Sequence, residues 1–137
     1  MNAVVDTHAL LWHLIAPDKL GAGARAILTA ADRGEAQILV PVLVLAELSM
    51  IAERNRVPGW TPQRVDVFAR LVSESDNYAM SPLSDGLVLA SRDLTAIPDI
   101  FDRLIAAEAR ELQVPLVTRD PVIPRSGAVP VIWEALP

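Results

Sequence analysis

The sequence contains no cysteine, so it can form neither a disulfide bond nor a zinc–thiolate site, and it has no cysteine nucleophile. It also has no apolar run that resembles a membrane span, because acidic residues, arginine or proline interrupt every such stretch. No basic region precedes the first apolar segment, and Asp6 lies inside that segment. We therefore expect no signal peptide, no association with membranes and a cytoplasmic location.

Lysine is almost absent, since Lys19 is the single lysine among 12 basic residues. The net charge of −5 argues against a protein that coats nucleic acid through a broad basic surface. The chain lacks the glycine-rich loops that bind nucleotide phosphates and the Gly-x-Ser-x-Gly motif of serine hydrolases. His8 and His13 are five residues apart, which is the wrong spacing for one helix face. The sequence thus offers few routes to chemistry other than carboxylates.

Four acidic residues lie within or beside apolar segments, where an unpaired ionised carboxylate costs on the order of several kcal/mol. They are Asp6, Glu47, Asp102 and Asp120. Purely structural roles are also open to three of them: Asp6 as a helix cap, Asp102 as a first-turn helix acid and Asp120 as a turn residue. Four such residues nevertheless predict a shared site for a hard cation, Mg²⁺ or alternatively Mn²⁺, because these ions prefer oxygen ligands.

Short apolar runs alternate with amphipathic stretches, which predicts a single α/β domain over residues 1–137. A turn is expected around Pro17, Gly21 and Gly23, and a helix is expected to start near Pro62. We expect strands at 3–6, 37–40, 78–80, 116–118 and 129–133, and further helices at 7–15, 24–33, 42–55, 84–92 and 99–112.

Strands separated by helices pair in parallel, and ligands bind outside the carboxyl ends of such strands. Asp6 and Asp120 fall at strand ends, whereas Glu47 and Asp102 fall in helices. We therefore expect all four carboxylates to meet at one edge of the sheet.

Other residues near these acids have two interpretations each. The hydroxyl of Thr118 is a candidate to orient a metal-bound water or a phosphate, or it belongs to an ordinary strand end. Trp12 is a candidate for an exposed interface anchor or a core residue. Three arginines are candidates for contacts with RNA phosphates, with plain solvent exposure as the alternative: Arg103, Arg119 and Arg125.

The ordered set of motifs resembles the PIN-domain family, specifically the VapC-like toxins of toxin–antitoxin systems. Each segment is weak alone, but together they follow the family order over nearly the whole chain. The residue at 100, isoleucine, departs from the proline that is frequent there. The matching segments are 5–12, 45–48, 99–107, 115–120 and 131–133.

This resemblance implies a three-layer α/β/α sandwich with a central parallel sheet and a metal-dependent ribonuclease activity. It also implies a cognate antitoxin, an RNA substrate and a homodimer. By position, Asp6, Glu47, Asp102 and Asp120 would be the catalytic, metal-binding acids. Asp99 matches a further acid of this branch, and Thr118 matches the hydroxyl residue before the last acid.

Two other function classes compete with the nuclease. A phosphoryl-accepting signalling domain also gathers acids at strand ends, but it needs a lysine beside the acceptor, and Lys19 lies in a turn after the first helix. A catalytically silent module that binds RNA or protein is the main alternative. It would gain nothing from four mutually repelling carboxylates.

Overall fold

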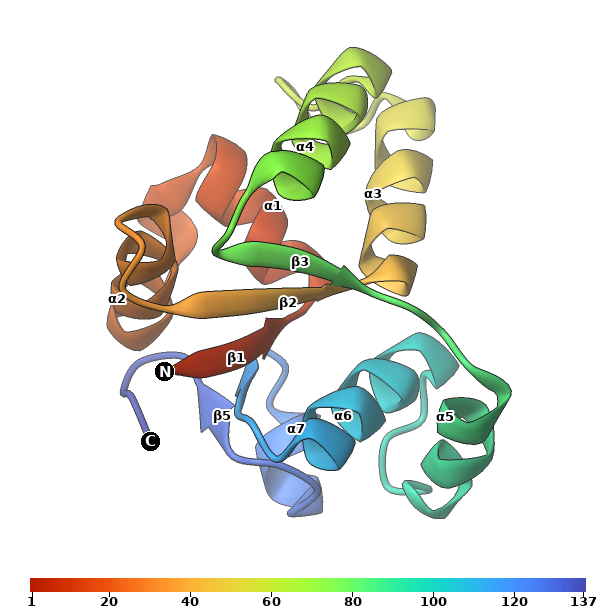
Figure 1. Ribbon diagram of the computed structural model, residues 1–137. Coiled ribbons are helices and arrows are strands. Elements are labelled where there is room, and N and C mark those ends of the chain that lie inside the picture. Colours follow the sequence, from red (N-terminus) through yellow and green to blue (C-terminus); the bar gives the residue numbers. More distant parts are fainter.

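The computed structural model describes residues 1–137 as a five-stranded sheet with helices on both faces (Figure 1). All four pairs of neighbouring strands are parallel, in the order β3-β2-β1-β4-β5. The predicted α/β class and parallel sheet are confirmed. The strands are β1 (Asn2–Val5), β2 (Gln37–Pro41), β3 (Tyr78–Ser81), β4 (Leu116–Val117) and β5 (Val131–Ile132).

The helices form the two outer layers of the sandwich. The connections from β1 to β2 and from β2 to β3 contain α1 to α4, which cover one face. Those from β3 to β4 and from β4 to β5 contain α5 to α7, which cover the other (Figure 1). The helices are α1 (Thr7–Ile15), α2 (Ala22–Asp32), α3 (Val42–Arg54), α4 (Pro62–Glu74), α5 (Asp85–Ala90), α6 (Ile100–Leu112) and α7 (Val122–Ser126). None of them has the length and apolarity of a membrane span.

Several predicted boundaries were wrong. The helix expected at 84–92 ends at Ala90 and continues as a 3₁₀ turn over Ser91–Asp93, and β5 is two residues long rather than five. The sequence did not predict α7, because five residues that include Pro124 are too few to show helical periodicity. Gly23, expected in a turn, lies inside α2.

The first turn of α2 is capped by the C-terminal segment of the chain. The backbone N–H groups of Gly23 and Ala24 donate to the carbonyl oxygens of Glu134 and Trp133, at 3.0 and 2.8 Å. These bonds satisfy two of the donors that a helix N-terminus leaves free. The backbones approach so closely that a Cβ atom on Gly23 would lie 2.6 Å from the carbonyl carbon of Ala135. Glycine is required here for packing, which the turn interpretation missed.

Replacing Gly23 by alanine is therefore expected to destabilise the protein by about 1–3 kcal/mol, because the C-terminal segment must move away. Alanine favours a helix by about 1 kcal/mol over glycine, so the expected sign is opposite to the propensity effect. Gly86→Ala in α5 is the matched control, since its Cβ would meet nothing closer than Ser84 Oγ at 3.9 Å. Urea denaturation of both variants measures the difference, and equal stabilities would contradict the packing explanation.

The central strand β1 is the most enclosed strand and leads directly into Asp6. Ala3, Val4 and Val5 are fully buried between β2 and β4. The chain must therefore deliver the Asp6 carboxyl to the carboxyl edge of the sheet, at the margin of the core. This position explains how an acid can follow three buried apolar residues.

Candidate active site

The four predicted carboxylates line one cleft of about 490 Å³ at the carboxyl edge of β1 and β4. Asp99 lines the same cleft, so the structure brings together all five acids singled out in the sequence. Thr118, the sixth predicted residue, is buried behind the cleft and does not line it. The remaining lining residues are Thr7, His8, Trp12, Arg119 and Pro121.

Asp6 is held at the start of α1 and points one oxygen into the helix. Its Oδ1 accepts a hydrogen bond from the Ala9 backbone N–H at 3.0 Å, so Asp6 is the N-cap of α1. Burial raises the pKa of Asp6 from 3.8 to about 6, although the Thr118 hydroxyl and the Ala9 N–H partly counter this effect. The capping role and the position in the cleft therefore coexist.

Glu47 reaches the cleft from the second turn of α3 and is fixed by α1. The hydroxyl of Thr7 donates to Glu47 Oε1 at 2.8 Å, and the Thr7 side chain is itself buried. This contact joins residues 40 positions apart in the sequence. Thr7 thus neither caps α1, as Asp6 does, nor needs a metal-bound water to satisfy its hydroxyl. It orients a carboxylate.

Asp102 has the most crowded electrostatic environment in the cleft. Burial is the largest cause that raises its pKa, from 3.8 to about 7. The charges of Asp99, Asp120, Asp6 and Glu47 raise it further, in that order. All five carboxyl groups are therefore close enough to interact, and near neutral pH Asp102 carries its charge only part of the time. A cation in the cleft would reverse this penalty.

Asp99 and Asp120 both order the backbone beside the cleft. Asp99 is the N-cap of α6, and its Oδ1 accepts from the N–H groups of Phe101 at 2.8 Å and Asp102 at 3.1 Å. Asp120 Oδ1 accepts from the Val122 N–H at 2.9 Å, and the Asp120 N–H donates to Thr118 Oγ1 at 3.1 Å. Thr118 thus fixes the turn that presents Asp120.

The donor set suits a hydrated divalent cation. No three acidic or histidine side chains in the structure converge closely enough to enclose a metal ion. Mg²⁺ usually takes one or two protein carboxylates directly and keeps several waters, so a loose ring of carboxylates fits this ion. Burial and the repulsion between the carboxylates, which together raise the pKa of Asp102, supply the electrostatic reason for binding a cation.

The structure places two further residues that the sequence singled out. Trp12 is half-buried and lines the cleft rather than presenting an exposed surface. Its spacing of four from His8 could have predicted this, because residues four apart share a helix face. Their rings lie 5.8 Å apart. Arg103 is tied to the backbone, since its Nε and Nη2 donate to the Ile97 carbonyl oxygen at 2.9 and 2.7 Å.

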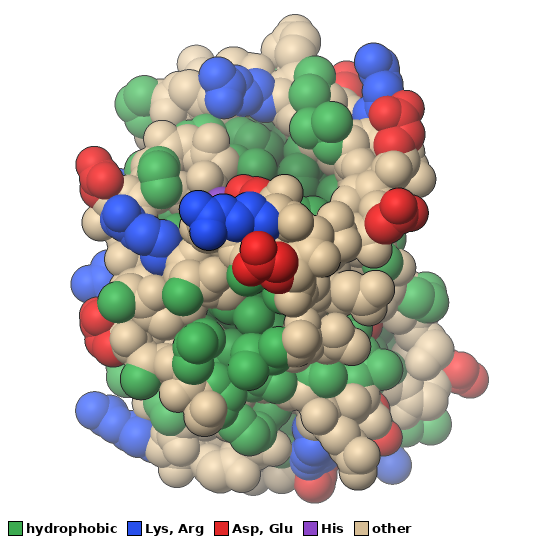
Figure 2. Space-filling view, turned by 60° about the vertical axis from the view of Figure 1, so that its left-hand side comes forward, with side chains coloured by type: hydrophobic (Ala, Val, Ile, Leu, Met, Phe, Trp, Pro, Cys, Tyr) green, Lys and Arg blue, Asp and Glu red, His purple; other side chains and the backbone are tan.

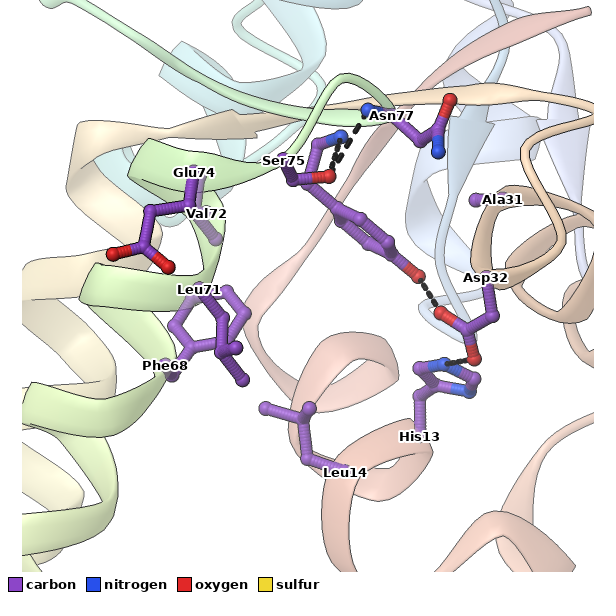
Figure 3. A pocket seen from close by; sticks show the side chains of 11 residues that line it. His13, Leu14, Ala31, Asp32, Phe68, Leu71, Val72, Glu74, Ser75 and Asn77 are labelled. Carbon is purple, nitrogen blue, oxygen red and sulfur yellow. Dashed lines mark hydrogen bonds and ion pairs between the residues drawn. The ribbon is translucent and has the colours of Figure 1, made fainter.

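A larger pocket, of about 690 Å³, lies away from the acidic cleft between α1, α2, α4 and β3 (Figure 3). Leu14, Phe68 and Leu71 face it, and a chain of hydrogen bonds crosses its wall. The Tyr78 hydroxyl donates to Asp32 Oδ1 at 2.6 Å, and Asp32 Oδ2 pairs with His13 Nε2 at 2.9 Å. Burial, and then Asp32, raise the pKa of Tyr78, so this hydroxyl remains a donor at all ordinary pH values.

Replacing Tyr78 by phenylalanine is expected to lower the free energy of unfolding by about 0.5–1.5 kcal/mol, because it deletes the hydroxyl and keeps the ring. The acidic cleft shares no lining residue with this pocket, so the arrangement of the carboxylates is expected to be unchanged in the folded variant. Chemical denaturation of the wild type and the variant measures the difference in stability. Equal free energies of unfolding would contradict a stabilising role for this hydrogen bond.

Comparison with known proteins places this fold in a family. The model of the PIN domain matches residues 3–128. Comparison of the sequence with curated proteins gave no match. Among solved structures, the VapBC2 complex of Rickettsia felis, bound to a promoter DNA fragment, matches with a TM-score of 0.69 and 16% identity, over 97% of this chain and 99% of that chain.

Two further structures have the same fold. VapC20 of Mycobacterium tuberculosis, described as a toxin that cleaves the sarcin–ricin loop, has a TM-score of 0.67 and 16% identity, over 98% of this chain and 99% of that chain. FitAcB of Neisseria gonorrhoeae has a TM-score of 0.63 and 14% identity, over 94% and 95%. At these identities the structures show a shared fold. Because the family model spans nearly all of the sequence, the chain belongs to the PIN domain family.

Proposed function

We propose that this protein is a metal-dependent endoribonuclease and the toxin of a toxin–antitoxin pair. The observation that carries the proposal is the convergence of Asp6, Glu47, Asp102 and Asp120 on one cleft, where burial and then the neighbouring carboxylates raise the pKa of Asp102. These four residues would hold Mg²⁺, with Mn²⁺ as an alternative. When bound, such an ion activates water and stabilises the charge that develops on the phosphodiester.

The residues of the chain divide the remaining work. Thr7 holds Glu47 in its orientation, and Thr118 fixes the turn that carries Asp120. Asp99 uses one oxygen to cap α6 and lines the cleft with the rest of its carboxyl group, so it would add negative charge beside Asp102. In this arrangement the carboxylates would position the metal and would not themselves act as nucleophiles.

The comparisons support the biological context of this proposal. PIN domains are generally nucleases, and the similar structures include complexes named for toxin and antitoxin and a toxin described as cleaving the sarcin–ricin loop. We accordingly propose a cognate antitoxin as the protein partner, RNA as the substrate, a homodimer as the assembly and the cytoplasm as the compartment. A single continuous core supports one PIN domain over residues 1–137.

A catalytically silent module that binds RNA or protein is the second candidate, because no three of the carboxylates that line the cleft lie close enough together to enclose a metal ion. The raised pKa of Asp102, which comes from burial and then from the other carboxylates, weighs against this candidate, since a silent module has no use for gathering mutually repelling charges.

Cleavage of labelled total RNA by antitoxin-free protein, with Mg²⁺, with Mn²⁺ and with EDTA, separates the two candidates. We expect cleavage with either metal, none with EDTA and none by Asp6→Asn. Absence of cleavage by folded, antitoxin-free wild-type protein with both metals would favour the silent module.

A further inference from the structure

Arg119 is the one lysine or arginine that lines the acidic cleft. It lies in the turn between β4 and α7, next to Asp120, and its side chain is exposed. Guanidinium groups beside carboxylates normally form charge-assisted hydrogen bonds with them. Arg119 forms no hydrogen bond and no ion pair with any of the five acids, so its donors are available to a ligand.

An aromatic support holds the guanidinium apart from the acids. Cζ of Arg119 lies 5.7 Å from the centroid of the Trp12 ring, within the range of a cation–π interaction. The Trp12 ring is fixed by Trp133 at 5.9 Å and by His8 at 5.8 Å. Lys19 Nζ lies 5.9 Å from the same ring, so a second positive charge contacts this aromatic side chain.

We propose that Arg119 binds a backbone phosphate of the RNA beside the scissile bond and that Trp12 positions the guanidinium for this contact. The inference rests on the ribonuclease function proposed above. A cleft of five carboxylates repels a polyanion, so a substrate phosphate needs a cation at the rim in addition to any metal. The planar fork of arginine matches two phosphate oxygens at once.

The charge distribution favours a local contact over a broad basic surface. The protein carries a net charge of −5, and on the face shown in Figure 2 the basic and acidic side chains are intermixed, without a continuous basic band. Binding of RNA would therefore depend strongly on the few basic side chains near the cleft. Arg119 is the one among them that lines it.

Fluorescence anisotropy of a labelled single-stranded RNA, with Mg²⁺ and in an Asp6→Asn background that prevents cleavage, tests the contact. We expect Arg119→Gln to weaken binding about tenfold and to reduce the slope of log Kd against log salt by about one. Arg119→Lys is expected to restore part of the affinity. Arg70→Gln is the control, because Arg70 in α4 is exposed, lies outside the cleft and makes no side-chain hydrogen bond or ion pair. Unchanged binding by Arg119→Gln, or an equal loss in Arg70→Gln, would overturn the proposal.

The role of Trp12 is tested in the same assay. Trp12→Leu is expected to weaken binding a few-fold alone but to have no further effect when combined with Arg119→Gln, because both changes remove one interaction. Trp12→Phe retains an aromatic ring and is expected to bind nearly as the wild type, which controls for disturbed folding. Additive losses in the double variant would show that Trp12 does not act through Arg119.

Cleavage kinetics distinguish this inference from the proposed function. In an otherwise wild-type chain, Arg119→Gln is expected to raise KM about tenfold with a smaller change in kcat, and a fall in kcat alone would contradict a phosphate-binding role. If wild-type protein binds RNA through Arg119 but does not cleave it with either metal, the contact stands and the ribonuclease function fails. If the wild-type protein cleaves RNA and Arg119→Gln binds and cleaves as the wild type does, the ribonuclease function stands and the phosphate contact fails.

Discussion

Asp102→Asn is expected to stabilise the metal-free protein while it lowers RNA cleavage by at least about a hundredfold. Both effects arise from the Asp102 carboxylate, whose charge is disfavoured first by burial and then by the charges of the other acids of the cleft. Asparagine keeps the shape of the side chain and removes the charge. It relieves the repulsion in the absence of metal, and it removes a proposed ligand in its presence.

The direction of the pH effect follows from the raised pKa. Because the folded protein holds the Asp102 proton more tightly than the unfolded chain, its stability declines as the pH rises from about 4 through about 7. Asp6, with a pKa raised to about 6, acts in the same direction. The pKa shift of Asp102 corresponds to at most about 4 kcal/mol of free energy. Because solvent screens this partly exposed side chain, Asp102→Asn is expected to raise the free energy of unfolding by only about 1–2 kcal/mol at pH 8.

Thermal unfolding in EDTA at pH 5 and pH 8 measures this effect. Wild-type protein is expected to lose stability between the two values, and Asp102→Asn is expected to lose less. Asp66→Asn in α4 is a suitable control, since Asp66 is exposed and makes no hydrogen bond or ion pair. A variant at Asp102 that is less stable than wild type at pH 8 would show that the carboxylate is already compensated without a metal.

Thr7→Val is expected to weaken divalent-metal binding about tenfold to a hundredfold, although Thr7 is not itself a proposed ligand. Its hydroxyl orients Glu47 from α1 at 2.8 Å. Loss of a hydrogen bond that orients a metal ligand typically costs this much affinity. Thr7 is buried, and valine has nearly the same shape as threonine, so the fold is expected to tolerate the substitution.

Calorimetric titration with Mn²⁺ measures this loss, and Thr7→Ser, which retains the hydroxyl, is the matched control. Cleavage by Thr7→Val is expected to be low at limiting metal and to recover at high metal concentration. Equal metal affinity in the valine and serine variants would show that the contact between Thr7 and Glu47 does not shape the site.

The carboxylates could be predicted from the sequence because each conflicts with its apolar neighbours. Asp6 after β1 and Glu47 in α3 stand out in this way, and parallel topology then predicts one shared edge. The helices α1, α3 and α6 were predicted to within one or two residues, since their lengths allow apolar periodicity to be seen.

The missed features depend on contacts between residues far apart in the sequence. The bond from Thr7 to Glu47 and the packing of Trp133 on Trp12 leave no local pattern. The backbone contact that requires Gly23 arises only when the C-terminal segment closes over α2. Arg119 was named among several exposed arginines, but only the structure shows that its guanidinium lies over an aromatic ring at the cleft.

The most direct test of the metal centre is titration of Mn²⁺ into folded, metal-free and antitoxin-free protein, followed by calorimetry. Wild-type protein is expected to bind the ion, Asp102→Asn is expected to bind it far more weakly, and Asp66→Asn is expected to match the wild type. Absence of binding by the wild type, or equal binding by all three proteins, would contradict a metal site in the acidic cleft.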